Sequence, residues 1–212
     1  MRSRSQRGFT LAEILTVLVI MGLMLCVVAF CVPLFLNGPQ EAQSQVDNVE
    51  SAALALYKMQ HDTRPSTIKG VFGCATLPIP TCSQPTPGPN MPPTQAVVIQ
   101  TANGTGQFML QNGNPNWQGF IVYWLTPNAD GTSNELRRAF VPMIGPYDVT
   151  GAAAAVVAAL GLTSYTTVAQ DVVDMRFAVD MSTNTVDLQL DGGDKTGNKS
   201  SLQLAGNSYV RN

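Results

Sequence analysis

The chain has 212 residues and a formal net charge of −2, and only 12% of its residues are charged. A soluble domain usually carries about twice that share of charge. The low and negative balance excludes a nucleic-acid surface built from bulk basicity, and the uneven spread of the charges excludes a soluble enzyme with a uniform surface. Only one apolar stretch is long enough to span a bilayer, which excludes a polytopic membrane protein.

That apolar stretch covers residues 14–36, and Thr16 is its only mildly polar side chain. At helical rise it is roughly 35 Å long, enough for the hydrocarbon core of a membrane. Because Arg2, Arg4 and Arg7 precede it, the N-terminus is expected in the cytoplasm and the rest of the chain outside. A cleaved secretory signal would have a shorter apolar region and a small-residue cleavage site. Length and charge leave a simple signal anchor open.

One carboxylate lies at the start of this stretch. Glu13 would cost about 2.5–3.5 kcal/mol if it sat at bilayer depth. Two readings are open: Glu13 lies near the head groups and pairs with Arg7 or with water, or it finds a partner for its charge inside the membrane.

The residues around Glu13 form a recognisable pattern. Residues 7–15 read RGFTLAEIL, which combines a short basic leader, Gly8, Phe9, a glutamate at the fifth position counted from Phe9, and an apolar helix. This stretch resembles the class III signal of type IV pilins and of type II secretion pseudopilins, over about the first 30 residues.

The resemblance implies several expectations. A prepilin peptidase would cut between Gly8 and Phe9 and N-methylate Phe9, and Glu13 would pair with the new amine of a neighbouring subunit. The protein would wait in the inner membrane and then enter a periplasmic or extracellular filament. Its partners would be the peptidase and other pilin or pseudopilin subunits.

The first exported residues are expected to continue as a helix. Asn37, Gly38 and Pro39 predict a breaker or hinge, and residues 40–61 have helical periodicity. The predicted buried face of this helix consists of Ala42, Val46, Val49, Ala53 and Leu56. An isolated helix in an unrelated domain would show the same pattern.

Within residues 63–95, seven of the chain's fourteen prolines fall between Pro78 and Pro93. Such a segment predicts neither a helix nor an interior strand. Cys74 and Cys82 lie within it, and export into an oxidising compartment favours a disulfide between them. With a single histidine in the chain, a zinc site is a poor alternative.

The remaining residues alternate short strand-like runs with turns. Residues 150–160 predict an alanine-rich helix with Thr150 as its N-cap and Gly161 as its stop. Residues 171–180 and 185–190 predict a hairpin. One long helix followed by strands indicates an α+β fold, with the helix packed on an antiparallel sheet as in pilins. The strands are predicted at 95–101, 118–125, 136–143, 171–180, 185–190 and 201–204.

Nothing in the sequence predicts an enzyme or a cofactor. His61 is the only histidine and is expected at a solvated helix end. Asp191 and Asp194 resemble a calcium turn slightly but lack EF-hand spacing, so no metal is assigned and calcium there stays open. Arg137 and Arg138 are adjacent on a predicted strand and should point to opposite faces, so no nucleic-acid partner is predicted.

Residues 121–140 are similar to the central hairpin of W-type minor pilins and J-type pseudopilins. The sequence therefore predicts a structural subunit, a minor pilin or pseudopilin, with a major pilin as an alternative. The alternative from another class is a signal-anchored periplasmic binding or adhesion protein that does not polymerise. The predicted organisation is leader 1–8, assembly helix 9–36, amphipathic continuation 37–62, Pro-rich loop 63–95 and β-rich head 96–212.

Overall fold

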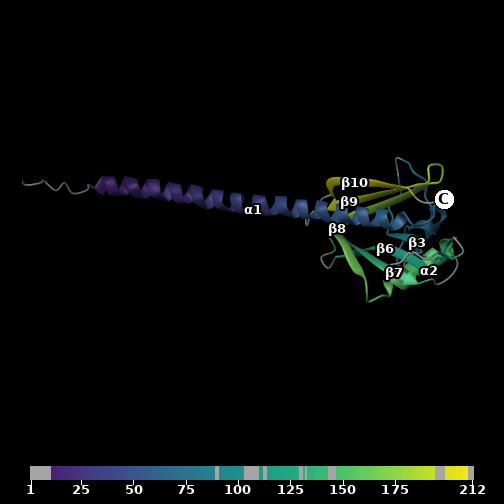
Figure 1. Cartoon of the computed structure of the whole chain (residues 1–212). Coiled ribbons are helices and arrows are strands. Elements are labelled where there is room, and N and C mark those ends of the chain that lie inside the picture. The colour runs from purple at the N-terminus through teal and green to yellow at the C-terminus, as the bar shows by residue number, and fades with distance from the viewer. Residues whose placement is uncertain are drawn as a thin grey trace, which may run out of the picture. The chain divides into compact units, whose positions relative to one another are not determined.

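The computed structural model describes residues 11–88, 91–102, 110–111, 114–128, 131, 133–142, 147–193 and 199–209. The chain divides into two compact units, residues 1–45 and residues 46–212. Helix α1 (Leu11–Thr63) contributes to both. In the first unit it is the whole of the described structure, and in the second it is the first element of a head (Figure 1).

Helix α1 is uninterrupted over its 53 residues, so the break predicted at residues 37–39 is wrong. Pro39 lacks one backbone donor and Gly38 is a weak helix former, which is why the sequence favours a break there. Helix formation is cooperative, and intact turns on both sides carry the backbone through this point. The expected continuation of the first helix into the head is confirmed.

The part of α1 in the head packs on the sheet through a different face from the one predicted. Ala52, Ala55, Leu56 and Met59 are buried, whereas Val46 is 59% exposed. Of the predicted residues, Ala42 has a side chain outside the described ones, Val46, Val49 and Ala53 are exposed, and Leu56 is buried. This part of the helix carries apolar residues on more than one side, so their periodicity does not select a single face.

The head contains an eight-stranded antiparallel sheet, which confirms the α+β class. Its strand order is β10-β9-β8-β7-β6-β3-β1-β2. All six predicted strands are present, several of them longer than expected, and the sequence missed the short strands β1, β2, β4 and β5. The sheet consists of β1 (Val71–Cys74), β2 (Cys82–Ser83), β3 (Ala96–Thr101), β6 (Gly119–Pro127), β7 (Asn134–Pro142), β8 (Thr166–Asp180), β9 (Thr185–Gly193) and β10 (Lys199–Tyr209), while β4 (Leu110–Gln111) and β5 (Asn114–Pro115) form a separate pair.

Strand β1 corrects the prediction that residues 63–95 hold no interior strand. It lies between β3 and β2 and is fully buried, and a short 3₁₀ turn, η1 (Ile68–Gly70), leads into it. The prolines that argued against a strand all follow Cys74, so β1 keeps its backbone donors. The proline content of the whole segment hid a strand at its beginning.

The Pro-rich segment lies along β8. The first half of β8 pairs with β7 and the second half with β9. On the other side of the second half, the Thr94 amide donates to the Met175 carbonyl and the Val179 amide donates to the Pro85 carbonyl, both at 2.7 Å. Residues 85–88 and 91–94, called the Pro-rich strap below, thus cover a length of β8 that has no neighbouring strand on that side in the described part of the sheet, which protects it from pairing with other chains.

Two cores lie on the two faces of the sheet. The first joins α1 to residues of β1, β3, β6, β7, β8 and β9, and Figure 1 shows β9 and β10 on one side of the end of α1 and β3, β6 and β7 on the other. The second lies under helix α2 (Val149–Leu160). Asp148, and not Thr150 as predicted, caps α2, because its carboxylate accepts from the Thr150 and Gly151 amides. Gly161 ends the helix as expected.

Substitutions at Met59 and Leu54 test which face of α1 packs on the sheet and stabilises the head. Met59 is fully buried and Leu54 is 60% exposed. Met59→Ala leaves a cavity and should lower the free energy of unfolding by about 2–5 kcal/mol, whereas Leu54→Ala should change it by less than about 0.5 kcal/mol. Urea unfolding of the full chain in detergent measures both. Equal losses in the two variants would contradict the observed packing.

Candidate functional site

The candidate site is the N-terminal part of α1 and the residues just before it. Gly8 and Phe9 lie outside the described residues. Glu13 is in the first turn of the described helix, where the helix dipole favours a negative charge. Its side chain is exposed, and its backbone carbonyl accepts a hydrogen bond of 2.9 Å from the Thr16 hydroxyl. The Thr16 hydroxyl thereby has a local partner for its hydrogen.

The helix after Glu13 presents apolar side chains on every side. Leu11–Val32 has a mean hydropathy of 3.0 and none of its most apolar window is buried. Its 22 residues extend about 33 Å, enough to cross a membrane core. It overlaps the predicted stretch 14–36, and the side chains of residues 33–36 lie outside the described ones. An apolar surface of this kind is stable only in lipid or against other apolar helices.

Two features of the span bear on packing between helices. A Cβ placed on Gly22 would meet no atom within 4 Å, so the surface around Gly22 is open for a close approach by another helix. Cys26 and Cys31 are free thiols, exposed and half-exposed respectively. Their chemistry in an apolar span is that of small apolar side chains.

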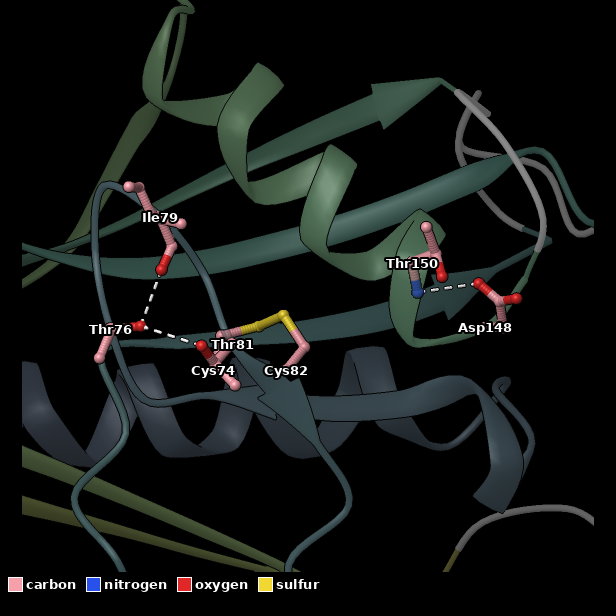
Figure 2. Close-up of a disulfide and its surroundings, with 7 residues drawn as sticks. All are labelled: Cys74, Thr76, Ile79, Thr81, Cys82, Asp148 and Thr150. Carbon is pink, nitrogen blue, oxygen red and sulfur yellow. Dashed lines mark hydrogen bonds between the residues drawn. A yellow bond between two sulfur atoms is a disulfide. The ribbon is translucent and has the colours of Figure 1, made fainter.

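The predicted disulfide between Cys74 and Cys82 is present (Figure 2). The two cysteines are directly opposed in the β1–β2 ladder, at a sequence separation of eight. Closing a loop of this length stabilises the fold by about 2–3 kcal/mol on the chain-entropy estimate. The bond ties the edge strand β2 to the buried strand β1.

A cluster of three side chains, Asp62, Tyr123 and Arg138, joins the end of α1 to the sheet and is called the Asp62 closure below. The Tyr123 hydroxyl donates to the Asp62 carboxylate at 2.6 Å, and the Arg138 Nε donates to the same carboxylate oxygen at 2.8 Å. Burial of Tyr123 and the nearby Asp62 charge raise the pKa of the tyrosine hydroxyl well above its ordinary value. Burial disfavours the charge on Arg138, but the hydrogen bonds and charge interactions with Asp62 and Tyr123 together outweigh it, so the pKa of Arg138 is raised.

Sequence reasoning missed this closure because its members are far apart in the chain. Asp62 and Arg138 are separated by 76 residues. The one feature of the sequence that bore on this contact was the adjacency of Arg137 and Arg138 on a strand. It predicted that their side chains point to opposite faces of the sheet, and this prediction is confirmed. Arg138 joins Asp62, whereas Arg137 forms an ion pair with Glu135 and lies 4.3 Å from the centre of the Tyr165 ring.

In the described part of the chain, no group of three or more His, Cys, Asp or Glu side chains could hold a metal. His61 is exposed at the end of α1, as predicted. Asp191 accepts from Gln189 at 3.2 Å, and Asp194 lies outside the described residues, so calcium at this turn stays open.

Tyr123 gives the head a defined response to alkaline pH. Its pKa is near 10 when unfolded and higher when folded, so its contribution to stability is complete below pH 10 and is lost as the pH rises above 10. Between pH 10 and 11 the parent should lose up to about 1.4 kcal/mol more than Tyr123→Phe. Urea unfolding at pH 8, 10 and 11 measures the difference. Parallel losses in both proteins would contradict the closure.

Comparisons with known proteins point to the same part of the chain. The family profile described as "Prokaryotic N-terminal methylation motif" matches residues 3–28. Type II secretion system core protein G of Klebsiella michiganensis is 38% identical over 82 residues, which cover 37% of this chain and 56% of that protein. The core protein G of Pseudomonas aeruginosa is 37% identical over 82 residues, with the same two coverages. That of Pectobacterium carotovorum is 38% identical over 77 residues, covering 34% of this chain and 47% of that protein.

The chain thus spans about half the length of the curated relatives it matches. No solved structure gives a significant match. The likeness is to pilin-like structural proteins and not to an enzyme, in agreement with the sequence prediction. The chain carries a class III prepilin methylation motif and is distantly similar to the pseudopilins of type II secretion systems.

Proposed function

We propose that this protein is a structural subunit of a type IV pilus or type II secretion pseudopilus, made as a prepilin and assembled through its N-terminal helix. The observation that carries the proposal is the apolar span Leu11–Val32, exposed on every side and overlapped by a methylation motif at residues 3–28. A span of this kind needs either lipid or a bundle of similar helices around it.

Processing would begin at Gly8. A peptidase that reads the backbone at the membrane surface benefits from a residue without a side chain. Cleavage of the Gly8–Phe9 bond removes Arg2, Arg4 and Arg7 and leaves the amine of Phe9 as the new N-terminus, which is then N-methylated. The leader holds the chain in the membrane with a cytoplasmic N-terminus, and its removal takes away the charges that enforce this orientation.

Assembly would follow from the charge at Glu13. The Phe9 amine of one subunit meets the Glu13 carboxylate of its neighbour, so each charge is compensated in an apolar bundle. The pairing also fixes how far one helix lies along the next. The open surface at Gly22 lets neighbouring helices approach closely.

We place the head outside the inner membrane and assign the chain to the minor subunits. The Cys74–Cys82 disulfide supports an exported head, because such bonds persist in oxidising compartments. The likeness of residues 121–140 to W-type and J-type proteins supports a minor subunit, as does the irregular Pro-rich strap along β8. A major subunit is the alternative to be tested.

Intact mass and N-terminal sequencing of the protein from membranes test the proposal. The mature parent should lack residues 1–8 and begin with N-methyl-phenylalanine. Gly8→Val should retain the leader, because its side chain blocks the peptidase. Gly22→Ala, which places a methyl group in open space, is the matched control and should be processed like the parent.

A signal anchor that never polymerises predicts the opposite result. Its mature form would keep Arg2, Arg4 and Arg7, and Gly8→Val would change nothing. That outcome would overturn the prepilin proposal.

A further inference from the structure

We propose that the disulfide-closed loop between β1 and β2 is a contact by which the head binds a co-assembled subunit, with Ile79 inserted into an apolar pocket of that neighbour. The inference rests on the proposed function and goes beyond it, because it adds a contact made by the head to the packing of the N-terminal helices.

The loop is held in one shape by several bonds. Its ends are joined by the Cys74–Cys82 disulfide and by the Ala75 amide, which donates to the Thr81 carbonyl at 3.1 Å. Across the loop, the Thr76 hydroxyl donates to the Ile79 carbonyl at 2.7 Å. Figure 2 shows the chain running from the disulfide through Thr76 and Ile79 and back.

The loop is also anchored to the head. Leu77 is half-buried and packs against the core beneath α2. Just after the loop, the Gln84 side-chain amide donates to the carbonyls of Ile68 and Val71 at 3.0 and 2.9 Å. A loop fixed at its ends and in its middle loses little conformational freedom when it binds, and this preorganisation favours affinity.

Ile79 points away from this anchored frame. Its exposed fraction is 82%, the highest among the large apolar side chains that the structure describes, including those of the membrane span. A single exposed aliphatic side chain needs no explanation in itself. Here a disulfide and four hydrogen bonds hold the loop that presents this side chain to water, which is the arrangement of an interface anchor.

The chemistry of the surrounding chain selects the kind of partner. No charged residue occurs between Lys69 and Asp130. A membrane surface would call for basic residues beside the apolar side chain, and residues 75–81 contain none. A glycan would be met by aromatic rings, and the loop has none of these either. The chemistry of the loop therefore fits an apolar pocket in a protein.

The small size of the loop selects a partner that is already held nearby. A free protein complex buries upwards of about 1,000 Å², more than one seven-residue loop can supply. When two subunits are already joined through their N-terminal helices, the second contact is intramolecular and a small anchor suffices. The neighbour in the same filament meets this condition, whereas a freely diffusing protein does not.

Photo-crosslinking of the full chain in cells with its natural partner subunits tests the inference. p-Benzoyl-phenylalanine replaces Ile79, and in the matched control it replaces Met181, which is 56% exposed at the β8–β9 turn. We expect an adduct from position 79, identified by mass spectrometry as a protein that carries a prepilin motif, and at least about tenfold less of it from position 181. No adduct, equal adducts, or an adduct with lipid or with a protein lacking the motif would overturn the inference.

Substitutions provide a second readout. Ile79→Asp should reduce incorporation of the chain into sheared filaments about tenfold, as expected for loss of an interface anchor. Ile79→Leu should retain incorporation, and both should keep the parent's thermal midpoint because the side chain is exposed. Parental incorporation of Ile79→Asp would contradict the contact. The N-terminus of the same sample separates the two proposals: N-methyl-phenylalanine without an adduct overturns the loop contact alone, whereas a retained leader overturns the prepilin proposal.

Discussion

Fifteen large apolar side chains between Leu11 and Val32 lie exposed on one helix, and this surface decides where the protein can exist. Burying such a side chain is worth about 1.5–3 kcal/mol, so keeping all of them in water would cost on the order of 20 kcal/mol or more. Water is therefore excluded as the final surrounding of this helix. Lipid tails and neighbouring helices are almost equally apolar, so the hydrophobic effect alone does not choose between them.

The free-energy difference between the helix in lipid and the helix in a bundle then depends on the few polar groups of the span. A carboxylate at bilayer depth costs about 2.5–3.5 kcal/mol, which is small beside the total apolar term but large beside the difference between lipid and bundle. Glu13 is the acid in question. A cationic amine offered by a neighbouring helix removes this cost, and hydrocarbon has nothing comparable to offer.

Several contacts make the head a rigid unit. Within residues 46–209, the helix is buried against the sheet through Ala55, Leu56 and Met59 and is closed at its end by Asp62 on Tyr123 and Arg138. A disulfide ties the edge strand β2 to β1, and the Pro-rich strap covers a length of β8 that would otherwise be free to pair with other chains. Because of these contacts, the head would keep its shape if the apolar helix moved from lipid into a bundle of helices.

Local patterns in the sequence predicted most of the elements. The span, the six longer strands, α2 and the Cys74–Cys82 bond all leave a signature in neighbouring residues. The break at residues 37–39 was wrong because cooperativity along a long helix outweighs two weak helix formers. The buried face of α1 was wrong because its exposed side, with Leu54 and Tyr57, is apolar too. Asp62 and Arg138 could not be paired, because their contact depends on the order of strands in the sheet.

Competition between the parent and Glu13→Ala tests the role of the docking charge most directly. Both proteins would be expressed together at equal levels, with tags on the exported head, and their ratio compared between membranes and sheared filaments. The account predicts equal processing and equal amounts in the membrane but a strong depletion of Glu13→Ala from filaments. Incorporation of Glu13→Ala as efficient as that of the parent would contradict it, and the apolar helix would then be a membrane tether only.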